Sequence, residues 1–331
     1  IDVSKTSSEM AILVNCEKVH GYTILNDASL LGDLKTVHNP EIIFETTGFY
    51  SRRLQAFLEE YSYAYTRLNP LEAKKQLDSL RVRKTDKIDA EKLAKSQLVH
   101  NRKPTYVQEE VYQHLRDLSR FYQNMTEDLV RTKNRLHKVL QVTFPELETL
   151  LSTPTGEQYW NLVMAFPCKE FVLSLSQSNL CEIIHQSTSK RISEKRIAYL
   201  TDKLIKLAKQ SFCAVKKTSP MLEEVRYYAQ ELLRLSERRQ VVLNDMVALA
   251  QPLPEYDILR SIPGIAETTA TSIIGELGDI RRFQSTNSCH NADFYEKRKR
   301  QYLQQILMQF LQYIVSFRQC FTSSTDLYHP C

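Results

Sequence analysis

Glycine is scarce in this sequence, with only seven in 331 residues. So few glycines argue against the glycine-rich loops of nucleotide-binding folds and against all-β barrels, and they favour long helices. The cysteines do not form a recognisable pattern either. There are seven of them, an odd number, and they are scattered and include no C-x-x-C pair. A zinc site and a disulfide framework are therefore disfavoured, and a reducing cytoplasm is the expected compartment.

Long apolar runs are missing as well. No stretch reaches the roughly 18 uninterrupted apolar residues that a membrane-spanning helix needs, so we expect no membrane span. No charged segment followed by an apolar one opens the chain, so we expect no secretory signal in this sequence. An initiator Met is also absent, and the chain opens at Ile1 in mid-pattern. We expect the natural amino end to be missing.

The charge is distributed unevenly along a chain long enough for two or three domains. The net charge is +5, with 42% hydrophobic and 25% charged residues, as in an ordinary globular protein. Residues 1–60 carry five basic and nine acidic residues, whereas residues 67–103 carry eleven basic and five acidic ones. A net charge of −4 is thus followed by one of +6. This asymmetry indicates a polyanionic partner.

The first 66 residues read as a small α/β unit. Residues 51–60 have apolar side chains at helical spacing. Short runs rich in β-branched and aromatic residues, bounded by turn residues, predict four strands: Ala11–Val14, Tyr22–Leu25, Glu41–Phe44 and Tyr63–Thr66.

The middle of the chain is helical. Apolar residues recur at spacings of three, four or seven in 105–145, which Pro145 ends, and again in 192–207 and 221–249. These runs predict antiparallel helices or a coiled-coil stalk, although a plain helical bundle fits the same periodicity. Residues 154–190 read as short helices and loops.

Four carboxylates form the first candidate site. Asp2 lies in the expected first strand, Glu45 ends another strand, and Asp86 and Asp89 are spaced to share one face of a helix that Thr85 can cap. Carboxylates at strand ends and on a helix face can converge, and clustered carboxylates stay ionised when cations neutralise them. Hard oxygen ligands suit Mg²⁺ or Mn²⁺, and two such ions can clamp the attacking and leaving oxygens of a phosphodiester. Taken singly, each residue is equally an ordinary surface acid.

A second candidate site is the turn Ile262-Pro263-Gly264-Ile265. A Pro-Gly turn between two short helices exposes amides at the start of the second helix, which can hold a phosphate without reading bases. Pro263, Gly264 and Ile265 therefore match a helix-hairpin-helix, while a tight structural turn is the alternative. The basic stretch adds nucleic-acid contacts at four residues, unless it is only a solvated helix face: Arg81, Arg83, Lys84 and Lys87.

The sequence resembles a known family in several motifs. Ile1-Asp2-Val3-Ser4-Lys5, Phe44-Glu45-Thr46-Thr47-Gly48, Lys84-Thr85-Asp86-Lys87-Ile88-Asp89-Ala90 and Leu259–Phe283 are similar to the DEDD transposases of bacterial insertion sequences, known as bridge-RNA-guided recombinases. The resemblance implies an α/β RNase H-like (RuvC-like) amino domain, then a mostly α-helical region with a coiled-coil stalk and a transposase domain that holds the helix-hairpin-helix. By the same resemblance Asp2, Glu45, Asp86 and Asp89 are the catalytic, metal-binding tetrad.

One family feature is absent. The family uses a serine nucleophile in a Ser-Gly pair, but no Gly occurs from Asp279 to Cys331. Ser285 and Ser288 are present, and nothing supports either as the nucleophile, so that residue is unknown. We infer an internal deletion, a frameshift or a decayed element.

The resemblance sets the expected function. It implies a transposase that cleaves and transfers DNA strands with Mg²⁺ (or Mn²⁺), binds element ends, target DNA and a structured guide RNA, and assembles as a homodimer or homotetramer in a bacterial or archaeal cytoplasm, near the nucleoid. The alternatives are a catalytically defective nucleic-acid-binding remnant and a RuvC-like junction resolvase. The expected regions are a RuvC-like domain, a stalk, a partial transposase domain and a disordered tail: 1–103, 104–250, 251–317 and 318–331.

Overall fold

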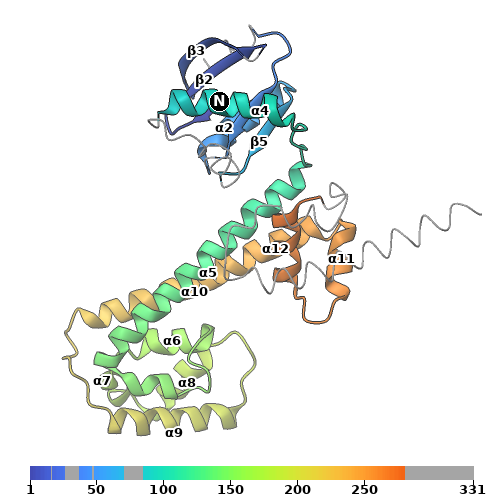
Figure 1. Ribbon diagram of the computed structural model, residues 1–331. Helices are drawn as coiled ribbons and strands as arrows, with labels where there is room; N and C mark the ends of the chain where they lie inside the picture. The colour runs from blue at the N-terminus through green and yellow to red at the C-terminus, as the bar shows by residue number, and fades with distance from the viewer. Residues whose placement is uncertain (16, 27–36, 47, 71–84, 280–331) are drawn as a thin grey trace, which may run out of the picture. The chain divides into compact units, whose positions relative to one another are not determined.

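The computed structural model describes residues 1–15, 17–26, 37–46, 48–70 and 85–279. Within these residues the chain forms two compact units, 1–108 and 109–279. Figure 1 labels their helices and strands. Ser285, Ser288 and the expected tail at 318–331 lie outside the described residues.

The first unit is a mixed α/β structure, as the sequence predicts. An antiparallel sheet has the order β1-β2-β3, and a second pair of strands is parallel. Two helices accompany the strands, α2 (Tyr50–Glu60) and α4 (Asp86–His100). The strands are β1 (Asp2–Val3), β2 (Ser7–Val14), β3 (Glu17–Leu25), β4 (Ile42–Glu45) and β5 (Tyr65–Leu68).

β2 and β3 are longer than the sequence predicts. The first half of β3, from Glu17, is largely exposed, whereas the first half of β2, from Ser7, alternates half-buried and buried residues that include Met10. The two strands pair as a hairpin from Ser7–Leu25 to Val14–Glu17, with an irregularity between Ile12 and Leu13. Backbone pairing with β2, rather than burial of its own side chains, therefore extends β3 beyond the predicted residues.

The apolar side chains of this unit lie on both faces of the strands. One cluster joins Val3 of β1 and Phe44 of β4 to Leu58 of α2. A smaller cluster joins Ile43 and Leu68 to Leu93 of α4. Because successive strand residues point to opposite faces, α2 and α4 cover opposite sides of the β4–β5 pair.

Two long helices form the axis of the second unit. α5 (Glu110–Thr143) and α10 (Met221–Ala250) pack along one another and run in opposite directions (Figure 1). α5 ends just before Pro145, as the sequence predicts, because proline cannot continue the helix. In the part of the chain that is described, no helix is both long and apolar enough to cross a membrane.

A separate bundle connects α5 to α10. It consists of a 3₁₀ turn, η1, and four helices around buried side chains that include Phe144, Trp160 and Leu200. The sequence groups residues 192–207 with the long stalk helices, but the structure packs this helix, α9, against α7 and α8 instead. An amphipathic period shows that one face is buried and does not identify the partner. The elements are η1 (Pro145–Thr149), α6 (Glu157–Ala165), α7 (Lys169–Leu173), α8 (Gln177–Gln186) and α9 (Glu194–Gln210).

Candidate functional site

Asp2 and Glu45 lie on neighbouring strands. The amino nitrogen of Ile1 donates a hydrogen bond to the carbonyl oxygen of Ile43 over 2.7 Å, which joins the start of β1 to β4. If the two strands are parallel, this bond sets Ile1 opposite Phe44 and Asp2 opposite Glu45. Ile1 and Phe44 share the apolar cluster under α2, whereas Ile43 belongs to the other face. Only the parallel register agrees with this burial.

The same alternation places both carboxylates on the face that α4 covers. Asp2 stands between two residues of the α2-side cluster, and Glu45 follows Phe44 of that cluster, so both side chains project to the other face. α4 contacts β1, β2 and β4. Asp2 and Glu45 are half-buried, and two neighbouring carboxylates at this depth have the donor chemistry that fits a hard cation such as Mg²⁺.

Asp86 and Asp89 lie in the first turn of α4. Asp86 is exposed and Asp89 is half-buried, one turn before Leu93, which packs on the sheet. Thr85 occupies the N-cap position with an extended backbone, but its side chain makes no capping hydrogen bond, which corrects the expected cap. Its carbonyl oxygen instead accepts from the amides of Ile88 and Asp89 over 2.9 and 3.0 Å.

The structure does not draw the four carboxylates into one ligand sphere. Among the residues that it describes, no three His, Cys, Asp or Glu side chains come close enough to hold a metal ion. It therefore brings Asp2 and Glu45 together on adjacent strands and leaves Asp86 and Asp89 on the helix above that face. A joint metal site of all four remains a prediction from the sequence.

An ion pair that sequence reasoning did not identify fastens α4 to the sheet. Glu91 accepts from Lys18 of β3 at 3.3 Å and from Lys95 of its own helix at 2.7 Å. These two hydrogen bonds, Lys95 first, lower the pKa of Glu91 below its ordinary value of 4.5. Lys18 and Glu91 are 73 residues apart in sequence, so no local spacing could reveal the pair.

The ion pair predicts a pH-dependent contribution to stability. Because the folded state lowers the pKa of Glu91, its contribution is complete above pH 4.5 and is lost as the pH falls below that value. We expect Glu91→Gln to lower the free energy of unfolding by less than about 1 kcal/mol at pH 7, since the pair is partly exposed. Urea unfolding at pH 7 and pH 3 measures this difference. If Glu91→Gln lowers the free energy of unfolding as much at pH 3 as at pH 7, the ion pair of Glu91 does not contribute to stability as proposed.

The Pro-Gly turn joins two short helices, α11 (Pro254–Ser261) and α12 (Glu267–Leu277). The amide of Ile265 donates to the carbonyl oxygen of Ile262 over 3.1 Å, and Gly264 has a φ of +87°, as the third residue of a type II turn requires. Pro263 and Gly264 are exposed, whereas Ile265 is buried. The turn is thus anchored by one apolar side chain and presents its backbone to solvent.

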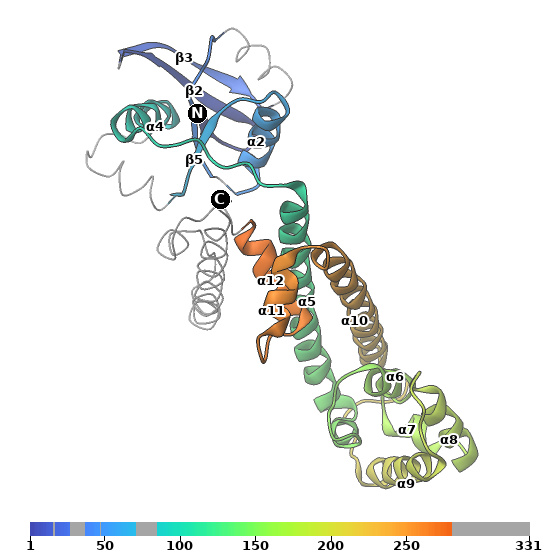
Figure 2. The ribbon, with the colours of Figure 1, turned by 90° about the vertical axis from the view of Figure 1, so that its right-hand side faces the viewer.

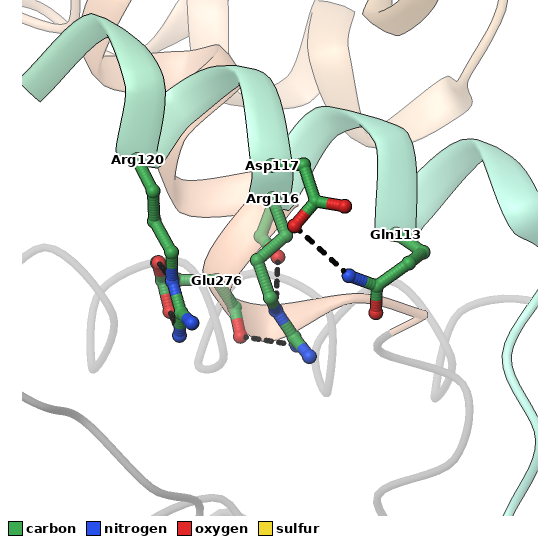
Figure 3. Close-up of polar contacts among 6 residues, drawn as sticks. Gln113, Arg116, Asp117, Arg120 and Glu276 are labelled. Carbon is green, nitrogen blue, oxygen red and sulfur yellow. Dashed lines mark hydrogen bonds and ion pairs between the residues drawn. The ribbon is translucent and has the colours of Figure 1, made fainter. Parts of the chain in front are cut away.

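The α11–α12 hairpin is docked on α5 by arginines that sequence reasoning missed (Figure 3). The Arg116 guanidinium donates to the carbonyl oxygens of Gly275 and Glu276 over 3.1 and 3.0 Å, where the end of α12 leaves them without helical partners. Arg120 pairs with the Glu276 carboxylate at 3.2 Å. These contacts join residues more than 150 positions apart, so the sequence carries no local signal of them.

A buried polar pair supports the same junction. The Tyr112 hydroxyl of α5 donates to the Glu255 carboxylate of α11 over 3.2 Å, and both side chains are almost fully buried. Next to it, the α12 backbone approaches α5 so closely that a Cβ atom on Gly275 would lie 2.9 Å from the Leu115 carbonyl. The hairpin is therefore held in one position relative to α5.

Most of the basic residues expected to contact nucleic acid cannot be placed. Lys87 is exposed in the first turn of α4. Arg81, Arg83 and Lys84 lie outside the described residues.

Two protein-family models match this chain. A model described as a transposase, of the DEDD type of IS110, matches residues 1–145, and a model described as the transposase IS116/IS110/IS902 family matches residues 256–291. The first match contains Asp2, Glu45, Asp86 and Asp89, and the second contains the Pro263-Gly264 turn. No curated protein matches the chain.

Proposed function

Because these matches support a transposase of the IS110 type, we propose that the chain cleaves and transfers DNA strands with the help of divalent metal ions. The observation that carries the proposal is the pairing of Asp2 and Glu45 on adjacent strands, under a helix that begins with Asp86 and Asp89. Carboxylates from separate elements on one face of a sheet are the ligand set that phosphodiester chemistry with Mg²⁺ needs.

The strand arrangement supports an RNase H-like amino-terminal domain. The bond between Ile1 and Ile43 sets β1 of the antiparallel sheet β1-β2-β3 beside β4 of the parallel pair β4-β5. α2 and α4 cover the two faces of that pair. The carboxylates of Asp2 and Glu45 then lie where the antiparallel sheet and the parallel pair adjoin.

In the proposed site Asp2 and Glu45 would hold Mg²⁺, and Asp86 and Asp89 would complete the ligand set from α4. The bound ions would stabilise the charge on the attacking and leaving oxygens of the phosphodiester. The protein's own part is to hold the carboxylates in position. Lys87, exposed beside Asp86, can contact the flanking phosphate.

The α11–α12 hairpin is proposed to bind the DNA backbone as a helix-hairpin-helix. Its exposed turn leads directly into α12, whose first-turn amides and helix dipole favour a phosphate. Such contacts position DNA without reading its sequence. A structured guide RNA and a homodimer or homotetramer complete the proposal by resemblance to the same family.

A second candidate function is a nucleic-acid-binding remnant without catalysis. One observation favours it: no Ser-Gly pair follows Gly278, because no glycine occurs from Asp279 to the end of this sequence. Such a protein would keep the hairpin and the basic residues but would not complete strand exchange.

A cleavage assay separates the two functions. The purified chain is incubated with DNA carrying the sequences that flank its own gene, RNA transcribed from those flanks, and Mg²⁺. We expect cleaved or joined products at defined positions that disappear when EDTA removes the metal. Binding of the same DNA without any product would favour the remnant.

A further inference from the structure

A second concentration of positive charge lies in the bundle between α5 and α10. Residues 187–217 carry nine Lys or Arg residues against only Glu194 and Asp202, a net charge of +7, which exceeds the +5 of the whole chain. This segment comprises the seven residues before α9, α9 itself and most of the loop that leads to α10 (Figures 1 and 2). It lies between the two segments that the transposase models match.

The acids in the described part of the chain leave these charges without ion-pair partners. Within the described residues, none of the nine basic side chains forms an ion pair. Lys203 donates instead to the carbonyl oxygens of Thr149 and Leu150, which gives it a structural role. Most of the others are exposed. An uncompensated field of this kind attracts polyanions.

Aromatic side chains lie among the cations where α9 ends. Phe212 is 86% exposed and has the Lys169 ammonium 5.8 Å from its ring centroid. Phe171 lies between two cations, Lys217 at 4.9 Å and Arg226 at 5.0 Å. We refer to Lys169, Phe171, Phe212, Lys216, Lys217 and Arg226 as the tip surface. Phe171 is half-buried and packs against the core of the bundle, whereas Phe212 is too exposed to have a role in that core.

The backbone positions the tip surface firmly. Lys169 also donates to the carbonyl oxygen of Ser211 over 2.6 Å, which ties the start of α7 to the loop. The amide of Ala214 donates to the carbonyl oxygen of Val142 in α5 over 3.1 Å. The loop that carries Phe212 is thus fixed at both sides, so that ordering it on binding costs little conformational entropy.

Cations that flank exposed aromatic rings are a combination suited to unpaired nucleic acid. Lysines contact phosphates of any strand, but an exposed ring can stack only on a base that is not already stacked in a duplex. We propose that the tip surface binds single-stranded DNA, with Phe212 stacking on a base and Lys169, Lys216 and Lys217 contacting the flanking phosphates. The choice of DNA rests on the proposed function, because strand cleavage and transfer release unpaired DNA.

Binding to fluorescent oligonucleotides tests this surface. The full chain is titrated with dT20, with a 20-base-pair duplex and with rU20, and fluorescence anisotropy gives each dissociation constant. We expect dT20 to bind best of the three. Phe212→Ala should weaken dT20 binding about 5- to 150-fold, the range for loss of one stacked base. Phe121→Ala is the matched control, since Phe121 is an exposed aromatic of α5 outside the tip surface.

Salt dependence tests the lysines separately. Removing two phosphate contacts from a single strand should lower the slope of log K against log salt by about 1.4. We expect this change in Lys216→Ala/Lys217→Ala, whereas Phe212→Ala should leave the slope unchanged. Circular dichroism checks that each variant is folded, and all three substituted side chains are exposed.

The outcomes distinguish this proposal from the proposed function. Wild-type affinity of Phe212→Ala for dT20, or a preference for duplex or rU20, would overturn the assignment of the tip surface whatever the cleavage assay shows. If the wild-type chain does not cleave DNA but Phe212→Ala still weakens dT20 binding, only the catalytic proposal is rejected.

Discussion

A Glu45→Gln chain is expected to lose Mg²⁺-dependent cleavage of its DNA. Gln keeps the size of Glu but removes the negative charge, so the metal would lose one of its proposed charged ligands. Metal ions contribute several kcal/mol to the stabilisation of such transition states. We therefore expect the cleavage rate to fall by about 100-fold or more. Quantification of the cleaved strand over time, at fixed Mg²⁺, gives the two rates.

Metal binding can be measured without catalysis. Mg²⁺ should raise the melting temperature of the wild-type chain, because a ligand that binds only the folded state stabilises it. This rise should be reduced in Glu45→Gln. Glu41→Gln is the matched control, an exposed acid just before the same strand. Equal cleavage and an equal response to Mg²⁺ in Glu45→Gln and wild type would refute the metal role of Glu45.

A Gly275→Ala substitution is expected to destabilise the second unit although Ala is the better helix former. In an open helix the change would gain up to about 1 kcal/mol. Here the new Cβ would meet the Leu115 carbonyl carbon and oxygen at 2.9 Å and the Arg116 amide nitrogen at 3.0 Å. These are backbone atoms of α5, so one helix must move. Overpacking of this kind typically costs about 1–3 kcal/mol.

Displacement of α12 would also affect its contacts with Arg116. The guanidinium bonds to the Gly275 and Glu276 carbonyl oxygens are 3.1 and 3.0 Å long and leave little room for a shift. Thermal unfolding of Gly275→Ala should therefore begin at a lower temperature. Ser272→Ala, half-buried in the same helix, controls for helix propensity and should be neutral or stabilising. A Gly275→Ala chain as stable as Ser272→Ala would show that α12 does not pack tightly on α5.

Sequence patterns identified most elements of the fold. Apolar spacing predicted α5 and α10 to within a few residues, because burial of one helical face imposes its period on the sequence. The Pro263-Gly264 pair predicted the turn, because only glycine readily adopts the φ of +87° found there. Such features depend on neighbours along the chain.

The candidate site was predicted less completely. Asp2 and Glu45 carry a signal in the sequence, because each stands next to apolar strand residues. The sequence could not show that Ile1 would pair with Ile43 and so set the two carboxylates side by side. It also gave no indication of Lys18 beside Glu91, or of Phe212 exposed beside Lys169. Those relations depend on the distances between separate elements.

The sequence by itself determined which segments become helix or strand and where the chain turns, since propensity, apolar period and turn chemistry act over a few residues. Only the tertiary structure decided which faces meet. It packed α9 in the bundle rather than beside α5, brought α12 to the backbone at Leu115, and aimed Arg116 at the end of α12. The physical reason is that long-range packing is selected by the shape and charge of surfaces that exist only after the local elements have formed.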